Sequence, residues 1–186
     1  MLMMAVTSLS VGVRVAGDLT QFVLPRNCTL PCRKSARFMT LLENQSEVTI
    51  EVREGTRPLT CHQELVMKFA LPLTTHARKR HHVIDVTFDM DANDCLTVIA
   101  RDVTTRSEAR QSMPSLNRRR YTHEQIERLV NDGEEFEEVD ASKVELVSAQ
   151  QVRWAEEYNR KLQGMYRNTH LALITTLISF GTRICL

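Results

Sequence analysis

Histidine and cysteine side chains lie near one another in the sequence and are candidates for a metal site or a nucleophile. His76, His81 and His82 lie in one basic stretch, and Cys61 and His62 are neighbours. Their spacing matches none of the ligand patterns of zinc sites, and adjacent residues of an extended chain point to opposite sides. The same divergence keeps Cys61 and His62 from forming a nucleophile and its base. We therefore expect no metal site and no catalytic residue here, only an exposed thiol at Cys61.

Three further patterns carry less chemistry than their residue types suggest. Cys28 and Cys32 are separated by three residues, which is not the interval of a redox pair. Residues 78–80 and 118–120 are basic runs without interleaved aromatic residues, so solvated loops are expected rather than nucleic-acid contacts. No glycine-rich phosphate loop of the G-x-x-x-x-G-K-[ST] type occurs in the chain. These observations predict a protein that is not an enzyme and holds no cofactor of its own.

Length and composition indicate one folded domain, or one domain with an appendage. The chain has 186 residues, of which 42% are hydrophobic and 25% charged, and its formal net charge is +1. This composition supports a buried core, and the near-neutral charge provides no general attraction to nucleic acid or acidic membranes. The five cysteines are odd in number and sparsely spread, which favours reduced thiols over a disulfide framework.

No stretch of the sequence approaches the roughly 20 apolar residues that a membrane-spanning helix needs. The most apolar run, residues 171–180, is shorter and includes two threonines and a serine. The first 13 residues are apolar but lack a preceding basic segment, so no secretory signal is recognised. We expect a cytoplasmic protein and do not expect membrane binding.

Strand patterns dominate the first two thirds of the chain. Residues 11–15 alternate between valine and a small or polar residue, a period of two that is typical of β-strands. Similar short apolar or alternating runs occupy residues 19–24, 38–42, 48–52, 66–71, 83–88 and 96–100. Turn residues separate them at positions 17–18 and 91–94, and residues 110–115 are a weak last strand because they are polar and include a proline. The pattern predicts an antiparallel β-sandwich or barrel.

The pattern changes to helices near the end of the chain. Thr122 and Gln125 form a capping box, and apolar residues then recur at helical spacing. We expect this helix to end near residues 139–140, and a second capping box, Ser142 and Glu145, to open another helix. The fold class is therefore mainly β with C-terminal α: an antiparallel β-sandwich followed by two helices.

Five short segments of the sequence are informative when they are taken together in their order along the chain. They are residues 24–31 (Leu-Pro-Arg-Asn-Cys-Thr-Leu-Pro), 43–45, 54–60, 86–93 and 127–132. This series resembles the substrate-binding domain of the heat shock protein 70 family, and the similarity runs from Leu2 to Asp140. The segments at residues 57–60 and 130–132 are most similar to the endoplasmic-reticulum branch of that family. The resemblance implies a chaperone-type peptide-binding domain with a helical lid.

The resemblance also implies a division of the chain. Residues 1–6 resemble the linker that follows the family's ATPase domain, and residues 7–116 match the β-sandwich. Residues 117–165 match a truncated lid, and residues 166–186 form a divergent apolar tail. Because no ATPase domain is recognised in this sequence, ATP is expected only from a separate domain or partner.

A cleft that holds extended peptides needs an apolar pocket for one side chain and groups that bond the peptide backbone. The resemblance implies a pocket lined by Val13, Phe38, Val48, Ile50 and Ile84. An alternating apolar face of this kind is equally consistent with ordinary packing of the core. The resemblance also implies contacts to the peptide backbone through Val15, Met39, Gln45 and Thr49, and an arch over the peptide formed by Ala16 and Leu41. Glu43 and Lys79 match residues that latch the lid.

The sequence leaves two functional hypotheses open. The first is binding of extended hydrophobic segments of unfolded proteins, without an ATPase cycle of its own. The alternative is a degenerate fragment that acts only as an interaction or self-association surface, through its linker or its apolar tail. In a membrane-docked variant of the alternative, residues 171–180 would lie at the lipid interface.

Overall fold

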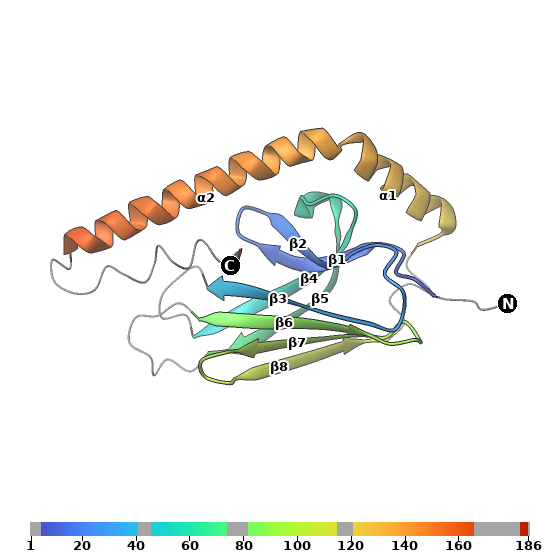
Figure 1. The fold of residues 1–186 in the computed structure, drawn as a ribbon, viewed down its shortest axis with the longest axis horizontal. Coiled ribbons are helices and arrows are strands. Elements are labelled where there is room, and N and C mark those ends of the chain that lie inside the picture. Colours follow the sequence, from blue (N-terminus) through green and yellow to red (C-terminus); the bar gives the residue numbers. More distant parts are fainter. Residues whose placement is uncertain (1–4, 41–45, 74–81, 115–120, 166–182, 186) are drawn as a thin grey trace.

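The computed structural model of the chain describes residues 5–40, 46–73, 82–114, 121–165 and 183–185. Within these residues the fold is a sandwich of two β-sheets with two helices on one side (Figure 1). One sheet has the strand order β2-β1-β4-β5, and the other has the order β8-β7-β6-β3-β9. Neighbouring strands are antiparallel except for β3 and β9, which are parallel. The predicted antiparallel β-sandwich is confirmed.

The bounds of the elements follow the chain order. They are β1 (Ser10–Val15), β2 (Leu19–Leu24), β3 (Cys32–Thr40), β4 (Glu47–Gly55), the 3₁₀ turn η1 (Thr60–His62), β5 (Glu64–Pro72), β6 (Val83–Met90), β7 (Leu96–Asp102), β8 (Glu108–Met113), α1 (His123–Glu135), α2 (Glu137–Met165) and β9 (Arg183–Cys185).

The core lies between the two sheets and follows the predicted period of two. Every second residue of β6 and β7 is buried, and the residues between them are partly or fully exposed. In β1 the side chains of Val11, Val13 and Val15 are buried, and Gly12 between them is buried as well. Each such aliphatic side chain contributes about 1.5–3 kcal/mol when it leaves water, so the alternation sets which face of each strand packs inward.

The turns use residues that tolerate a positive φ. Gly17 and Asp18, predicted to be a turn, have φ values of 78° and 55° between β1 and β2. Asp94 adopts a φ of 69° in the β6–β7 turn, where the Asp91 carboxylate accepts hydrogen bonds from the amides of Asn93 and Cys95, both at 2.8 Å. Short polar side chains of this kind stabilise tight turns through their own backbone.

The last strand of the sandwich, β8, is an edge strand that ends just before Pro114. It begins at Glu108, two residues earlier than the sequence predicted. Proline has no N–H to donate to a ladder, so the strand stops where the proline begins. The mostly polar residues of β8 are tolerated because an edge strand buries little of its outer face.

The first helix begins as predicted, but the prediction of a second capping box was wrong. The Gln125 amide donates to Thr122 Oγ1 at 3.3 Å, and the Thr122 amide donates to Gln125 Oε1 at 2.8 Å. The break falls at Phe136, and α2 then runs uninterrupted through Ser142. Ser142 Oγ donates to the Glu138 carbonyl at 3.0 Å, as a helix-interior serine does, so it caps nothing.

Helix α2 has 29 residues and is therefore roughly 43 Å long, and it runs along one side of the sandwich (Figure 1). Among the described residues, no helix is both long and apolar enough to cross a membrane.

Candidate functional site

The five residues predicted to line a pocket come together between the two sheets. Val13 lies on β1, Val48 and Ile50 on β4, Phe38 on β3, and Ile84 on β6. All five are at most 1% exposed and belong to one apolar cluster. Phe38 and Ile84 are direct partners across β3 and β6, which brings these two side chains to the same face. The five residues predicted to line a pocket are thus neighbours in the buried core, and the pocket and its use by a client stay predictions.

The residues predicted to bond a peptide backbone lie on β1, β3 and β4 or next to them, where the structure describes them. Val15 ends β1, and Ala16 follows it in the turn; both are buried. Met39 is half-buried near the end of β3, and Thr49 is exposed on β4. The other predicted site residues, namely Leu41, Gln45, Glu43 and Lys79, lie outside the described residues.

An ion pair that the sequence analysis missed joins the sandwich to the helices. Arg57 donates from Nε to Asp140 Oδ2 at 2.7 Å and from Nη2 to Oδ1 at 2.9 Å. The Arg57 side chain is 12% exposed and that of Asp140 is 2% exposed. The guanidinium also lies over the Phe136 ring, 4.4 Å from its centroid. A bidentate pair with a stacked ring fixes both distance and angle, so Arg57 clamps the start of α2 to the loop after β4.

The Arg57–Asp140 ion pair shifts the pKa values of both partners. The hydrogen bonds from Arg57 hold the pKa of the Asp140 carboxyl below its ordinary value, although partial burial opposes this shift. The same bonds raise the pKa of Arg57. Both groups are therefore charged over the whole ordinary pH range, and the clamp weakens only when Asp140 is protonated in acid.

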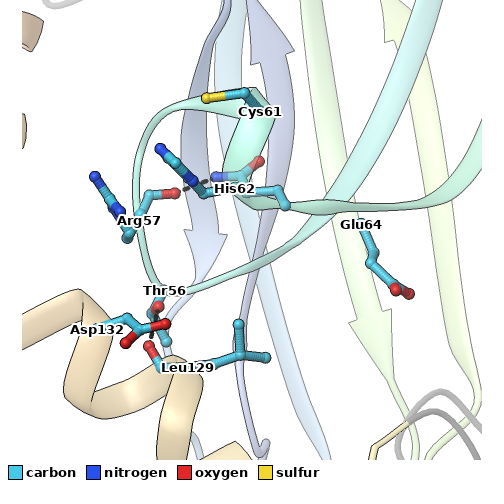
Figure 2. Close-up of a pocket in the computed structure, with 8 residues that line it drawn as sticks. Thr56, Arg57, Cys61, His62, Glu64, Leu129 and Asp132 are labelled. Atoms are coloured by element: carbon cyan, nitrogen blue, oxygen red, sulfur yellow. Dashed lines mark hydrogen bonds between the residues drawn. The ribbon is translucent and has the colours of Figure 1, made fainter. Parts of the chain in front are cut away.

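A second contact joins the same loop to α1. Thr56 Oγ1 donates to the carbonyl oxygen of Leu129 at 2.6 Å (Figure 2). A Cβ on Gly133 would lie 2.9 Å from both Cβ and Oγ1 of Thr56, which is closer than real Cβ atoms come to other heavy atoms. Glycine usually weakens a helix, and here the close approach of the loop requires it.

A cavity of about 340 Å³ opens beside these contacts (Figure 2). Its walls mix polar and apolar surface and come from the loop after β4, the 3₁₀ turn and α1; they include Arg57, Cys61, His62 and Asp132. Cys61 is an exposed free thiol, as predicted. Within the described part of the chain, no three histidine, cysteine or carboxylate side chains gather in a way that could hold a metal ion.

Comparison with known proteins decides which family this architecture represents. A family model described as Hsp70 protein matches residues 1–173. The chain belongs to the Hsp70 family. Two Hsp70 relatives are similar over most of this chain. The chaperone protein DnaK of Mycoplasmopsis agalactiae (strain NCTC 10123 / CIP 59.7 / PG2) is 37% identical over 147 residues, which are 79% of this chain and 24% of that protein.

The second Hsp70 relative gives the same result. The chaperone protein DnaK of Mycoplasmopsis pulmonis (strain UAB CTIP) is 36% identical over 146 residues, which are 78% of this chain and 24% of that protein. The chain thus spans about a quarter of the length of these Hsp70 chaperones. The resemblance to the Hsp70 family that was identified from short segments of the sequence is confirmed.

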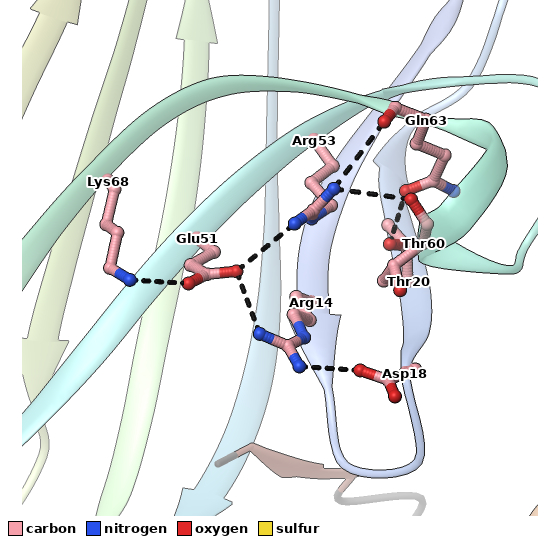
Figure 3. A network of polar contacts seen from close by, with 8 residues as sticks. All are labelled: Arg14, Asp18, Thr20, Glu51, Arg53, Thr60, Gln63 and Lys68. Carbon is pink, nitrogen blue, oxygen red and sulfur yellow. Dashed lines mark hydrogen bonds and ion pairs between the residues drawn. The ribbon is translucent and has the colours of Figure 1, made fainter.

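A charged network on the outer face of the four-stranded sheet holds this Hsp70 sandwich in register (Figure 3). The Glu51 carboxylate of β4 lies 2.8 Å from Lys68 Nζ on β5, 3.1 Å from Arg14 Nη1 on β1 and 3.5 Å from Arg53 Nη2 on β4. The hydrogen bond from Lys68, followed by that from Arg14, lowers the pKa of Glu51 against the effect of burial. Because Val13 and Ile50 belong to the bridged strands, the network also fixes their relative positions.

His82, considered above as a metal ligand, is instead half of a buried pair. Its Nδ1 lies 2.7 Å from Asp102 Oδ2, and the two side chains are 4% and 0% exposed. Burial raises the pKa of Asp102, but hydrogen bonds from Thr105, the Thr104 amide and His82 outweigh it and leave that pKa below its ordinary value. The His82 amide also donates to Thr40 Oγ1 at 2.9 Å, so the pair supports the end of β3 beside the apolar site.

Cys28 and Cys32 are free and half-buried, one in the loop after β2 and one at the start of β3. Burial, followed by a hydrogen bond with Cys28, raises the pKa of Cys32 to about 11. A thiol with so high a pKa is rarely a thiolate at neutral pH and is a poor nucleophile.

We expect Gly133→Ala to lower the free energy of unfolding by about 1 kcal/mol, although alanine in a free helix raises it by about that amount. The physical reason is overpacking against Thr56, which costs about 1–3 kcal/mol. The measurement is urea unfolding followed by circular dichroism. Glu135→Ala, an exposed site of the same helix, is the control and should change stability by less than about 0.5 kcal/mol. A stabilised Gly133→Ala variant would show that α1 does not dock on the Thr56 loop.

Proposed function

We propose that this Hsp70 chain binds extended apolar segments of unfolded proteins at the edge of β3, without an ATPase cycle of its own. One observation carries the proposal: the apolar cluster of Val13, Phe38, Val48, Ile50 and Ile84 shares a residue with a strand edge that pairs with an extended segment. Phe38 belongs to both features, because it is buried in the cluster and pairs across the β3 edge with β9. Membership of a chaperone family supports the proposal.

Two kinds of interaction would hold such a client. Main-chain groups of an edge strand bond an extended peptide of any sequence, which supplies affinity without strong selectivity. An apolar site for one side chain then adds about 1.5–3 kcal/mol for a leucine or isoleucine. The two lid helices would limit exchange, since the Arg57–Asp140 clamp holds them to the sandwich. Release of a client would depend on its own dissociation rate and on opening of the lid, with no nucleotide-driven step.

The test is a titration of a fluorescently labelled, leucine-centred heptapeptide followed by anisotropy. We expect saturable binding with a Kd in the micromolar range, which corresponds to about −8 kcal/mol. A heptapeptide with aspartate at its centre is the control and should bind at least about tenfold more weakly. The Kd should be the same with and without ATP. Absence of saturable binding by a folded chain, as judged by circular dichroism, would rule out the proposed function.

A further inference from the structure

The edge of β3 that faces away from β6 is occupied by a C-terminal segment of the same chain. Residues Arg183–Cys185 form β9, which runs parallel to β3 with Arg183 opposite Phe38, Ile184 opposite Met39 and Cys185 opposite Thr40. On its other side β3 pairs with β6 from Cys32 to Met39. Within the described residues, β9 is therefore the strand that completes this sheet next to β3.

The segment lies at the candidate cleft and not elsewhere on the sheet. Its contact with β3 is confined to the last three residues of that strand, where Phe38 joins the apolar cluster and Met39 was predicted to bond a client backbone. Strand β9 also lies next to β1, which belongs to the opposite sheet and carries Val13 and Val15. Figure 1 shows the C-terminus at this end of the sandwich, near the β1–β2 hairpin.

An extended segment that pairs with a sheet edge uses the same main-chain groups as a bound peptide does. Both cannot occupy those groups at once. Three residues form few hydrogen bonds, but a segment tethered to its site has an effective concentration in the millimolar range. A weak intramolecular contact of this kind can therefore compete with a micromolar client.

We propose that β9 is an intramolecular occupant of the cleft, so that residues 183–185 and an extended client compete for the edge of β3. This inference rests on the proposed function of the same site. It also indicates the chemistry that the edge accepts: a short extended segment with an aliphatic residue beside a basic one and no acidic residue, as in Arg183-Ile184-Cys185. The affinity measured for a client is then reduced by the fraction of molecules whose cleft is vacant.

The experiment compares the full chain with a variant that lacks residues 183–186. If nine molecules in ten hold β9 in place, deletion should lower the Kd of the labelled leucine-centred heptapeptide by about tenfold. Full-length Ile184→Pro should reproduce much of this gain, because proline has no N–H for the ladder. Ile184→Val, which keeps the backbone donor and a β-branched side chain, is the matched control and should behave as the unaltered chain. A synthetic hexapeptide with the sequence of residues 181–186 should compete with the labelled peptide on the truncated chain.

The possible outcomes separate the inference from the function on which it rests. Equal and measurable affinities for the full and truncated chains, with no competition by the hexapeptide, would overturn the inference and leave the proposed function standing. Absence of peptide binding by both folded chains would overturn both. Concentration-dependent oligomers of the full chain that disappear on truncation would show in sedimentation that β9 is supplied by a second copy, which overturns the intramolecular assignment.

Discussion

Val48→Phe is expected to weaken binding of the leucine-centred heptapeptide by about ten- to hundredfold. Val48 is 1% exposed and lies on β4 within the apolar cluster that includes Phe38 and Ile50. A phenyl ring there would fill the space that a client side chain needs, and loss of that burial costs about 1.5–3 kcal/mol. The measurement is the anisotropy titration, with circular dichroism to show that the variant is folded.

Overpacking alone could weaken binding by loosening the whole sandwich, at a cost of about 1–3 kcal/mol. Val98→Phe is the matched control, because Val98 is equally buried but lies on β7, which is separated from β3 by β6. It should destabilise the fold to a similar extent and leave peptide affinity nearly unchanged. Thr49→Ala should also have little effect, since Thr49 is exposed and would act through its main chain. Equal affinities for Val48→Phe and the unaltered chain would place the cluster in the core and outside any cleft.

Arg57→Ala is expected to release the helices from the sandwich. The substitution leaves Asp140 almost fully buried without its partner, and breaking such a pair costs about 3 kcal/mol. Native-state hydrogen exchange of the backbone amides of α1 should therefore accelerate by about a hundredfold, whereas amides of β6 should not change. Arg57→Lys keeps the charge and loses the planar fork, so it should give an intermediate rate.

An exposed arginine pair on the other sheet provides the control for this experiment. Arg37 lies 2.8 Å from Asp85, but their side chains are 61% and 38% exposed. Exposed pairs contribute little, so Arg37→Ala should change exchange in α1 hardly at all. If Arg57→Ala and Arg37→Ala accelerate α1 to the same small extent, the clamp does not hold the lid.

The clamp also predicts a direction of pH dependence. The pKa of Asp140 is lowered from its ordinary value of 3.8 in the folded state, so its contribution is complete above that value. It is lost as the pH falls through the lower folded pKa. Exchange in α1 of the unaltered chain should therefore accelerate in acid more than exchange in Arg57→Ala, after correction for the intrinsic rate.

Local patterns of the sequence determined the parts of the fold that depend on neighbours along the chain. The alternation in residues 83–88 and 96–100 predicted β6 and β7, because side chains of a strand must alternate between core and solvent whatever the partner strand is. The capping box at Thr122 predicted the start of α1, since both of its hydrogen bonds lie within four residues. The sequence segments that resemble the Hsp70 family predicted how the strands and helices are arranged along the chain.

Contacts between distant residues were decided by the tertiary structure alone. Arg57 and Asp140 are 83 positions apart, and an arginine or aspartate has many partners of opposite charge until the fold brings one of them near. Ser142 matched a helix start in sequence, but Asp140 is held by the clamp inside a continuous helix, and packing outweighed the local signal. The pairing of β9 with β3 has no local signal, because any extended segment can complete a strand edge and only the fold shows which segment reaches it.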